Sequence, residues 1–166
     1  MGTAVDRGLA FLDTVSVGGD WVSHAPLLAS IQDLAAAQAA WKPSPERKSI
    51  WEIANHVAFW TEYFVSRMAG EPPRPSGWYK DLQWQGLPEV TEDGWREAIQ
   101  RLRDAHEAFK AELAKRTDEQ LEQPLPGGRT PLFAYIQTEV THRCYHCGQI
   151  MYLRALQGLP PLESLE

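Results

Sequence analysis

Apolar residues recur at three- and four-residue steps along several stretches of this chain, a spacing that places them on one face of an α-helix. The clearest stretch begins after Ser49, which forms a capping-box pattern with Glu52. The stripe that follows contains Ile50, Ile53, Val57, Trp60 and Phe64. Gly70 and the prolines behind it end the pattern. We therefore expect a core-facing helix over about residues 50–69, and His56 lies beside its apolar stripe.

Two further helices are predicted in the second half of the chain. Thr91 has the character of an N-cap, and the apolar stripe after it steps through Trp95, Ile99, Leu102, His106, Phe109 and Leu113. Thr130-Pro131 indicates another start, with an N-cap followed by proline at the first helical position. This last helix is expected to run to about Gln157, because Gly158 and Pro160-Pro161 stop it.

The N-terminal part gives a weaker helical pattern. Residues 4–15 are weakly periodic, Gly18-Gly19 interrupts them, and Pro26 opens a second piece that extends to Leu34, which suggests one broken helix. His24, just before this piece, is expected to cap it or to border a pocket. No stretch alternates as a strand would, so the prediction is an all-α, four-helix bundle with long connecting loops, a fold that commonly builds metal sites from facing helices.

The connections between these helices are long. The segment from about residue 70 to 90 is rich in proline and glycine and exceeds what a compact bundle needs as a link. Its aromatic residues Trp78, Tyr79 and Trp84 form either a pocket wall or a small separate cluster. A second connection is expected over residues 118–128.

Composition narrows the classes of function. A chain of 166 residues fits one domain, here residues 1–166, and needs no disulfide or structural metal to hold a core. The net charge of −6 disfavours a nucleic-acid partner, and no apolar run is long enough to span a membrane. The first residues have no secretory pattern, so the expected location is cytoplasmic.

The candidate chemistry lies on the last helix. His142 and His146 are one helical turn apart, and the same narrow face carries Glu139 and Gln149. Together with His56, the two histidines would supply three neutral imidazoles. This ligand set suits a divalent transition metal with an open position for water or substrate. From the residues alone, ordinary surface or hydrogen-bonded core histidines remain an alternative.

Other known motifs fit these residues less well. Arg143 stands where zinc proteases of the His-Glu-x-x-His type place their glutamate, and the Glu139-x-x-His142 step has no second copy to complete a di-iron site. Cys144 and Cys147 lie in mid-helix without a preceding strand, which favours buried structural thiols over a redox pair. His106, in an apolar stripe, is expected to be a hydrogen-bonded core residue.

Two segments carry a resemblance to a known family. The first segment is residues 49–60, which include His56, and the second is residues 142–150, which include both later histidines and Gly148-Gln149-Ile150. Together with Gly70 and Leu153-Arg154, they occur in the order and spacing of the DinB/YfiT-like superfamily. The chain resembles these helical bundles from Trp21 onward. The resemblance implies that His56, His142 and His146 bind a divalent ion such as zinc, nickel or iron.

The resemblance also implies classes of activity. Characterised members include metal-dependent transferases that activate a low-molecular-weight thiol, so a thiol transferase or a hydrolase acting on a small-molecule substrate is expected, and a homodimer is plausible. The alternative is a non-catalytic, stress-associated metal-binding or dimerisation module. Residues near the proposed ligands that are candidates to orient them are Glu52, Asn55, Glu139 and Gln149.

Overall fold

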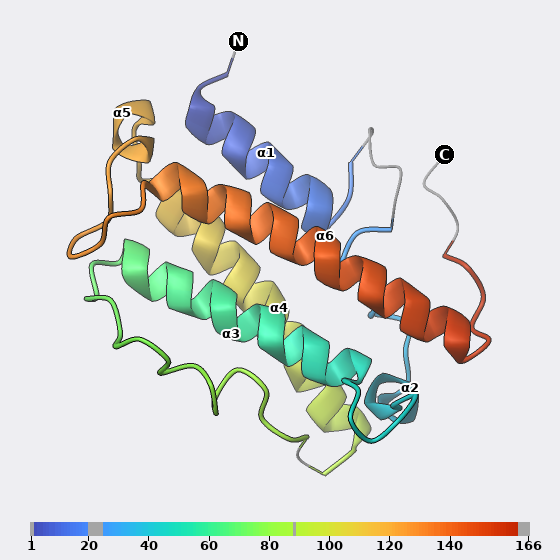
Figure 1. The fold of residues 1–166 in the computed structure, drawn as a ribbon. Coiled ribbons are helices and arrows are strands. Elements are labelled where there is room, and N and C mark those ends of the chain that lie inside the picture. The colour runs from blue at the N-terminus through green and yellow to red at the C-terminus, as the bar shows by residue number, and fades with distance from the viewer. Residues whose placement is uncertain (1, 20–24, 88, 163–166) are drawn as a thin grey trace.

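The computed structural model describes residues 2–19, 25–87 and 89–162. These parts hold six helices and no β-sheet: the four long helices are α1 (Ala4–Ser16), α3 (Ile50–Met68), α4 (Glu92–Leu113) and α6 (Leu132–Leu156), and the short ones are α2 (Ala36–Ala40) and α5 (Asp118–Leu121). The predicted all-α class is confirmed. The described chain has two short helices in addition to the four that the pattern indicated (Figure 1).

The four long helices pack in a ring. Helix α3 contacts α4 and α6, and α1 contacts α4 and α6. In Figure 1, α6 runs across the molecule with α1 on one side and α3 on the other. One apolar cluster gathers around Ile53, Val57 and Ile150, and another around Leu12, Phe109 and Ile136. Between Ile136 and Ile150, α6 contributes buried polar side chains to the interior.

The predicted helix boundaries at α3 and α4 are confirmed by their caps. The Ser49 hydroxyl accepts a hydrogen bond from the Glu52 amide at 3.1 Å, and the Ser49 amide donates to the Glu52 carboxylate at 2.9 Å. Gly70, with a φ of 100°, takes the left-handed conformation that favours glycine and follows the end of α3. Thr91 caps α4 by accepting from the Gly94 amide. These ends are set by local sequence.

The segment after Pro26 was predicted incorrectly. Helix α1 is present, but residues 27–33 form consecutive turns in which backbone hydrogen bonds alternate between the third and the fourth preceding residue. Leu27, Ile31 and Leu34 are all buried, so the apolar spacing here reports burial rather than a regular helix. The neighbouring α2 was not predicted, and His24 lies outside the described residues.

Two smaller differences concern the last third of the chain. Helix α6 begins at Leu132, one residue later than predicted, with Pro131 rather than Thr130 at its N-cap position and no side-chain cap. The predicted connection of residues 118–128 contains α5, which Thr117 caps by accepting from the Gln120 amide.

None of the helices in the described residues has both the length and the hydropathy that a membrane-spanning helix needs.

Candidate metal centre

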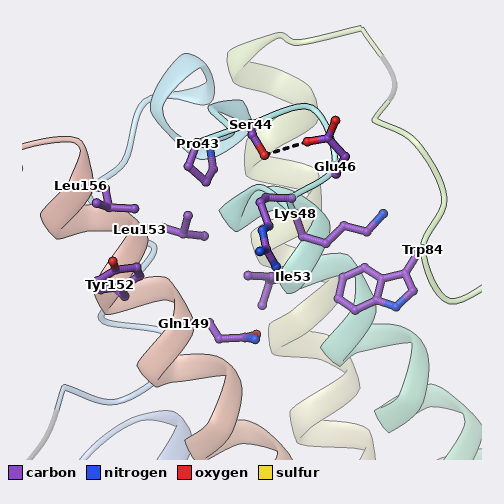
Figure 2. Close-up of a pocket in the computed structure, with 11 residues that line it drawn as sticks. Pro43, Ser44, Glu46, Lys48, Ile53, Trp84, Gln149, Tyr152, Leu153 and Leu156 are labelled. Carbon is purple, nitrogen blue, oxygen red and sulfur yellow. Dashed lines mark hydrogen bonds between the residues drawn. The ribbon is translucent and has the colours of Figure 1, made fainter.

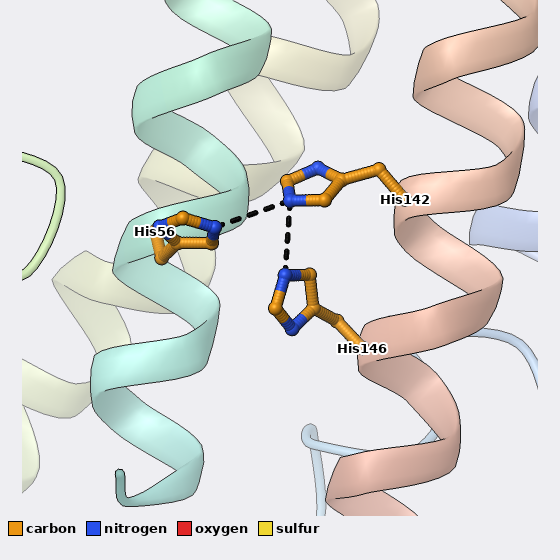
Figure 3. Close-up of side chains that lie close together, drawn as sticks. All are labelled: His56, His142 and His146. Carbon is orange, nitrogen blue, oxygen red and sulfur yellow. Dashed lines mark hydrogen bonds between the residues drawn. The ribbon is translucent and has the colours of Figure 1, made fainter. Parts of the chain in front are cut away.

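Three imidazole rings from two helices meet in the interior. The Nε2 atom of His142 lies 3.1 Å from Nε2 of His56 and 2.9 Å from Nε2 of His146, as Figure 3 shows. His56 comes from α3, and the other two come from successive turns of α6. His56 and His146 are buried, and His142 is partly buried. The structure therefore brings together the three histidines that the sequence indicated.

The outer nitrogens of two rings fix where their protons lie. Nδ1 of His56 faces the backbone carbonyl oxygen of Gln83 at 3.2 Å, and a carbonyl can only accept, so this Nδ1 carries the proton. Nδ1 of His146 lies 2.7 Å from the side-chain oxygen of Gln149. The amide nitrogen of Gln149 donates to the Tyr145 hydroxyl, which leaves the amide oxygen facing His146. Because that oxygen can only accept, Nδ1 of His146 also carries a proton. A neutral ring has one N–H, and both Nε2 atoms consequently present lone pairs to the centre.

The three inner nitrogens therefore have too few protons to satisfy one another. His142 can place at most one proton on its Nε2, while two lone pairs face it from His56 and His146. If its proton lies on Nδ1 instead, three lone pairs converge. Among the described residues, Nδ1 of His142 is buried without a hydrogen-bond partner, so neither tautomer is fully satisfied. A cation at the centre would accept all three lone pairs.

Burial keeps these rings neutral. Desolvation, together with repulsion from His146, lowers the pKa of His56 to about 4. Desolvation and the neighbouring His146 and His56 lower the pKa of His142 to about 3. Desolvation also lowers the pKa of His146, although its hydrogen bond to Gln149 opposes the shift. Neutral imidazoles are the form that binds metals, so the cluster is ready for an ion at neutral pH.

The spacing of the ring nitrogens also fits one ion. Nitrogens bound to a single divalent ion at about 2.1 Å lie about 3.0 to 3.4 Å apart, depending on the angle between the bonds. The two closest Nε2 pairs are separated by 2.9 and 3.1 Å, and candidate ligand atoms of all three residues lie within 4.8 Å of one another. Small outward shifts of the rings would give bonding distances.

Of the four residues predicted to lie near the ligands, Gln149 contacts one of them. Glu139 is buried beside the cluster, but its carboxylate accepts from Thr61 and Arg143 and contacts no imidazole. The Glu52 carboxylate accepts a hydrogen bond from the Ser49 amide at the start of α3 and forms an ion pair with Lys42, 2.8 Å away. Asn55 lines a separate hollow together with Glu52 and the segment 82–87.

The long connection between α3 and α4, in which the sequence indicated either a pocket wall or a separate aromatic cluster, supplies two contacts to His56. Besides the Gln83 carbonyl, the indole of Trp84 stacks flat on His56, with ring centroids 3.9 Å apart and planes 4° apart. The Gln83 side chain accepts from the Trp60 indole N–H at 3.2 Å, which ties this segment to α3. Trp84 thus forms a wall at the site, whereas Trp78 and Tyr79 pack in an aromatic cluster with Trp60.

Next to the histidines lies a second buried polar group, centred on Arg143. Its guanidinium donates to Glu139 at 2.8 and 3.0 Å, to Ser16 at 2.6 Å, to Thr61 at 3.2 Å and to Nδ1 of His106 at 3.0 Å. His106 in turn donates from Nε2 to Asp13 at 3.1 Å. His106 is therefore a hydrogen-bonded core residue, as predicted. The i, i+4 spacing of Glu139 and Arg143 could have indicated their ion pair.

The two cysteines differ from each other. Cys147 is buried, and its thiol donates to the backbone carbonyl of Ala25 at 2.9 Å, as expected of a structural thiol. Cys144 is exposed, which corrects the prediction that both are buried. Desolvation raises the pKa of both thiols, so neither has the lowered pKa of a reactive thiolate. Neither belongs to the group of candidate ligands.

Two cavities border the candidate metal centre, one through His142 and the other through residues that contact His56 and His146. The larger, about 560 Å³, extends between the start of α3 and the second half of α6 and is bordered by Trp84 and Gln149, each of which contacts a histidine of the cluster (Figure 2). The smaller, about 230 Å³, is lined by His142, Thr138, Trp60 and Phe64. The larger cavity has a size typical of small-molecule sites.

Comparison with known proteins identifies a matching family. A family model described as the DinB superfamily matches residues 23–150, a span that contains all three histidines. A search of curated proteins found no match.

Proposed function

The chain belongs to the DinB superfamily, and from this premise we propose that it is a metal-dependent enzyme in which His56, His142 and His146 hold one divalent ion. The observation that carries the proposal is the convergence of three Nε2 atoms, of which those of His56 and His146 present lone pairs because Gln83 and Gln149 hold the protons of these two rings on Nδ1. Zinc, nickel and iron all accept such a ligand set, and protein geometry alone does not select among them.

A bound ion with an open position would lower the pKa of a thiol or a water molecule and so provide a nucleophile at neutral pH. The residues of the chain orient and shield this centre. Gln149 and the Gln83 carbonyl hold the rings of His146 and His56 in place, and Trp84 covers one face of His56. Excluding water from that face strengthens the electrostatic interactions at the site.

The arrangement of the cavities favours group transfer. The larger cavity is bordered by Trp84 and Gln149, which contact His56 and His146, while the smaller one is lined in part by His142. A reaction between two bound molecules needs two places next to the reacting centre, whereas hydrolysis needs room for one substrate and water. We therefore propose a transferase that uses a low-molecular-weight thiol, with a hydrolase as the second candidate.

The metal site is tested by elemental analysis of the purified protein beside two variants. We expect about one ion per wild-type chain, as for a three-histidine site, and nearly none in His146→Ala. The matched control is His106→Asn, which changes a buried histidine outside the cluster and should retain the ion. Circular dichroism checks that each variant is folded. Equal metal content in wild type and His146→Ala would refute the proposed site.

A structural role is the alternative, because an ion bound by these residues would link α3 to α6. Chelation separates the roles. For a catalytic ion, removal should abolish thiol transfer to a general electrophile such as 1-chloro-2,4-dinitrobenzene while circular dichroism and thermal unfolding remain near those of the untreated protein. A cooperative loss of helix on chelation would favour the structural role instead.

A further inference from the structure

The larger cavity beside the histidines has a distinctive lining. Its walls include the aromatic side chains of Trp84 and Tyr152, and its apolar surface comes from Ile53, Leu153 and Leu156. Figure 2 shows Trp84 on one side of the cavity and Tyr152 on the other. Aromatic and aliphatic walls of this kind suit a flat apolar group.

Cationic side chains stand at the same cavity. Arg47 and Lys48 line it, and the acidic residue that lines it with them is Glu46, which accepts a hydrogen bond from Ser44 at 3.0 Å. The carboxylate of Glu52 forms ion pairs with two ammonium groups, that of Lys42 at 2.8 Å and that of Lys48 at 3.4 Å.

This group carries an excess of positive charge. Its three cations, Lys42, Arg47 and Lys48, face two carboxylates, those of Glu46 and Glu52, which leaves a local charge of +1 in a chain whose net charge is −6. A cationic rim in an acidic protein attracts anions to that position and discriminates against cations.

The cationic group is connected to the candidate metal centre by one side chain. The Lys48 ammonium lies 5.1 Å from the centroid of the Trp84 ring, and the same indole stacks on His56. An anionic group held by Lys48 or Arg47 would therefore lie one indole away from the three imidazoles.

We propose that this cavity binds an organic anion, a molecule with a carboxylate-type group at Arg47 and Lys48 and a flat apolar body between Trp84 and Tyr152. The assignment of that molecule as a reactant rests on the proposed function. Its binding does not, because none of the residues named here belongs to the candidate ligand group.

The test compares two probes of the same shape. 2-Naphthoate carries the negative charge and 2-naphthamide does not, and each is titrated into metal-free protein by NMR. We expect naphthoate to bind at least about tenfold more tightly, as one charge-assisted hydrogen bond would give. Added salt should weaken the binding of naphthoate more than that of naphthamide.

Substitutions locate the binding. Arg47→Gln and Lys48→Gln should each weaken naphthoate by about tenfold and leave naphthamide unchanged, whereas Lys115→Gln, a lysine that pairs with Glu112 away from the cavity, should change neither. Equal binding of the two probes, or variants without effect, would overturn the inference.

Metal analysis of the same protein preparations, made before the metal is removed for the titrations, separates this inference from the proposed function. A preference for naphthoate in a protein that binds no metal would leave the inference standing and refute the metal centre. A normal metal content with no preference for naphthoate would leave the metal centre standing and refute the inference.

Discussion

Helix α6 carries two buried polar groups side by side, and they differ in how well their members satisfy one another. The guanidinium of Arg143 directs its N–H groups at acceptors on Glu139, Ser16, Thr61 and His106. The neighbouring histidine cluster, in which His142 and His146 of α6 meet His56 of α3, has lone pairs directed at one another. A buried group that satisfies its own hydrogen bonds stabilises the fold, whereas one that leaves lone pairs converging is suited to a ligand.

The satisfied group is nearly complete. Within the described residues, Oε1 of Glu139 is its one buried atom without a hydrogen bond. Desolvation and the neighbouring Arg143 lower the pKa of His106, which stays neutral and accepts from Arg143 while donating to Asp13. The group joins α1, α3, α4 and α6, so it fixes the helices against one another around the candidate metal centre.

The largest expected effect comes from breaking the satisfied group. Arg143→Met leaves the Glu139 carboxylate buried without its cation and should lower the free energy of unfolding by about 3–5 kcal/mol. Urea denaturation measures the change. The double variant Glu139→Leu/Arg143→Met removes both charges and should recover most of the loss.

The matched control for that variant is an exposed ion pair. Arg101 binds Glu62 through two contacts of 2.7 Å, but both side chains are exposed to solvent over 43% of their surface, so Arg101→Met should cost at most about 1 kcal/mol. If Arg143→Met proved no more damaging than Arg101→Met, the stabilising role assigned to the Arg143 group would be wrong.

A smaller effect is expected when the metal-free histidine cluster is titrated. The pKa of His56 falls from 6.5 to about 4 and that of His142 to about 3 on folding, so the unfolded chain binds more protons below pH 6.5. Stability is therefore complete above pH 6.5 and is lost as the pH falls. Between about pH 6.5 and pH 5, above the midpoints of ordinary carboxylates, the loss should be at least about 2 kcal/mol.

Urea denaturation in the presence of a chelator, repeated at several pH values, measures this loss. His56→Gln removes one of the two histidines whose pKa falls to about 4 or below on folding, and should make the dependence of stability on pH shallower. A stability that is flat across this window would show that the rings become protonated without unfolding the chain, which contradicts their desolvated state.

The smallest effect on stability, with a large effect on metal binding, is expected at Gln149. Gln149→Leu removes the acceptor that holds Nδ1 of His146, so metal affinity should fall by about 10- to 100-fold. Stability without metal should change by about 1 kcal/mol or less. Competition with a chromophoric chelator measures the affinity, and Gln137→Leu, an exposed glutamine on the same helix, is the control. Unchanged affinity would mean that Gln149 does not orient the ring.

Local patterns predicted the parts of this protein that local physics decides. Capping at Ser49 and Thr91 and the helical repeat between His142 and His146 depend on neighbours in sequence, and the structure has each of them. The buried position of His106 followed from its place in an apolar stripe. Periodicity failed after Pro26, where residues such as Leu27 and Ile31 are buried by tertiary packing without forming a regular helix.

The surroundings of the histidines could not be predicted in the same way. Trp84 and the Gln83 carbonyl reach His56 from an irregular connection, whose path depends on packing against α3 and leaves no periodic signal. Glu52 illustrates the opposite error, since it lies one turn from His56 in sequence yet binds Lys42. Proximity along a helix suggests which residues share a face, but it does not decide which partner each side chain selects.

The origin of His56 on a different helix from its two partners has a consequence for evolution and for design. His142 and His146 keep a separation set by the helical repeat, whereas the distance to His56 follows from how closely α3 approaches α6. Enlarging or trimming an apolar side chain in the core cluster to which both helices contribute, such as Val57 of α3 or Ile150 of α6, is expected to widen or narrow the spacing of the three nitrogens. Preference for a larger or a smaller cation can thus be adjusted from the core, without replacing any of the three imidazoles.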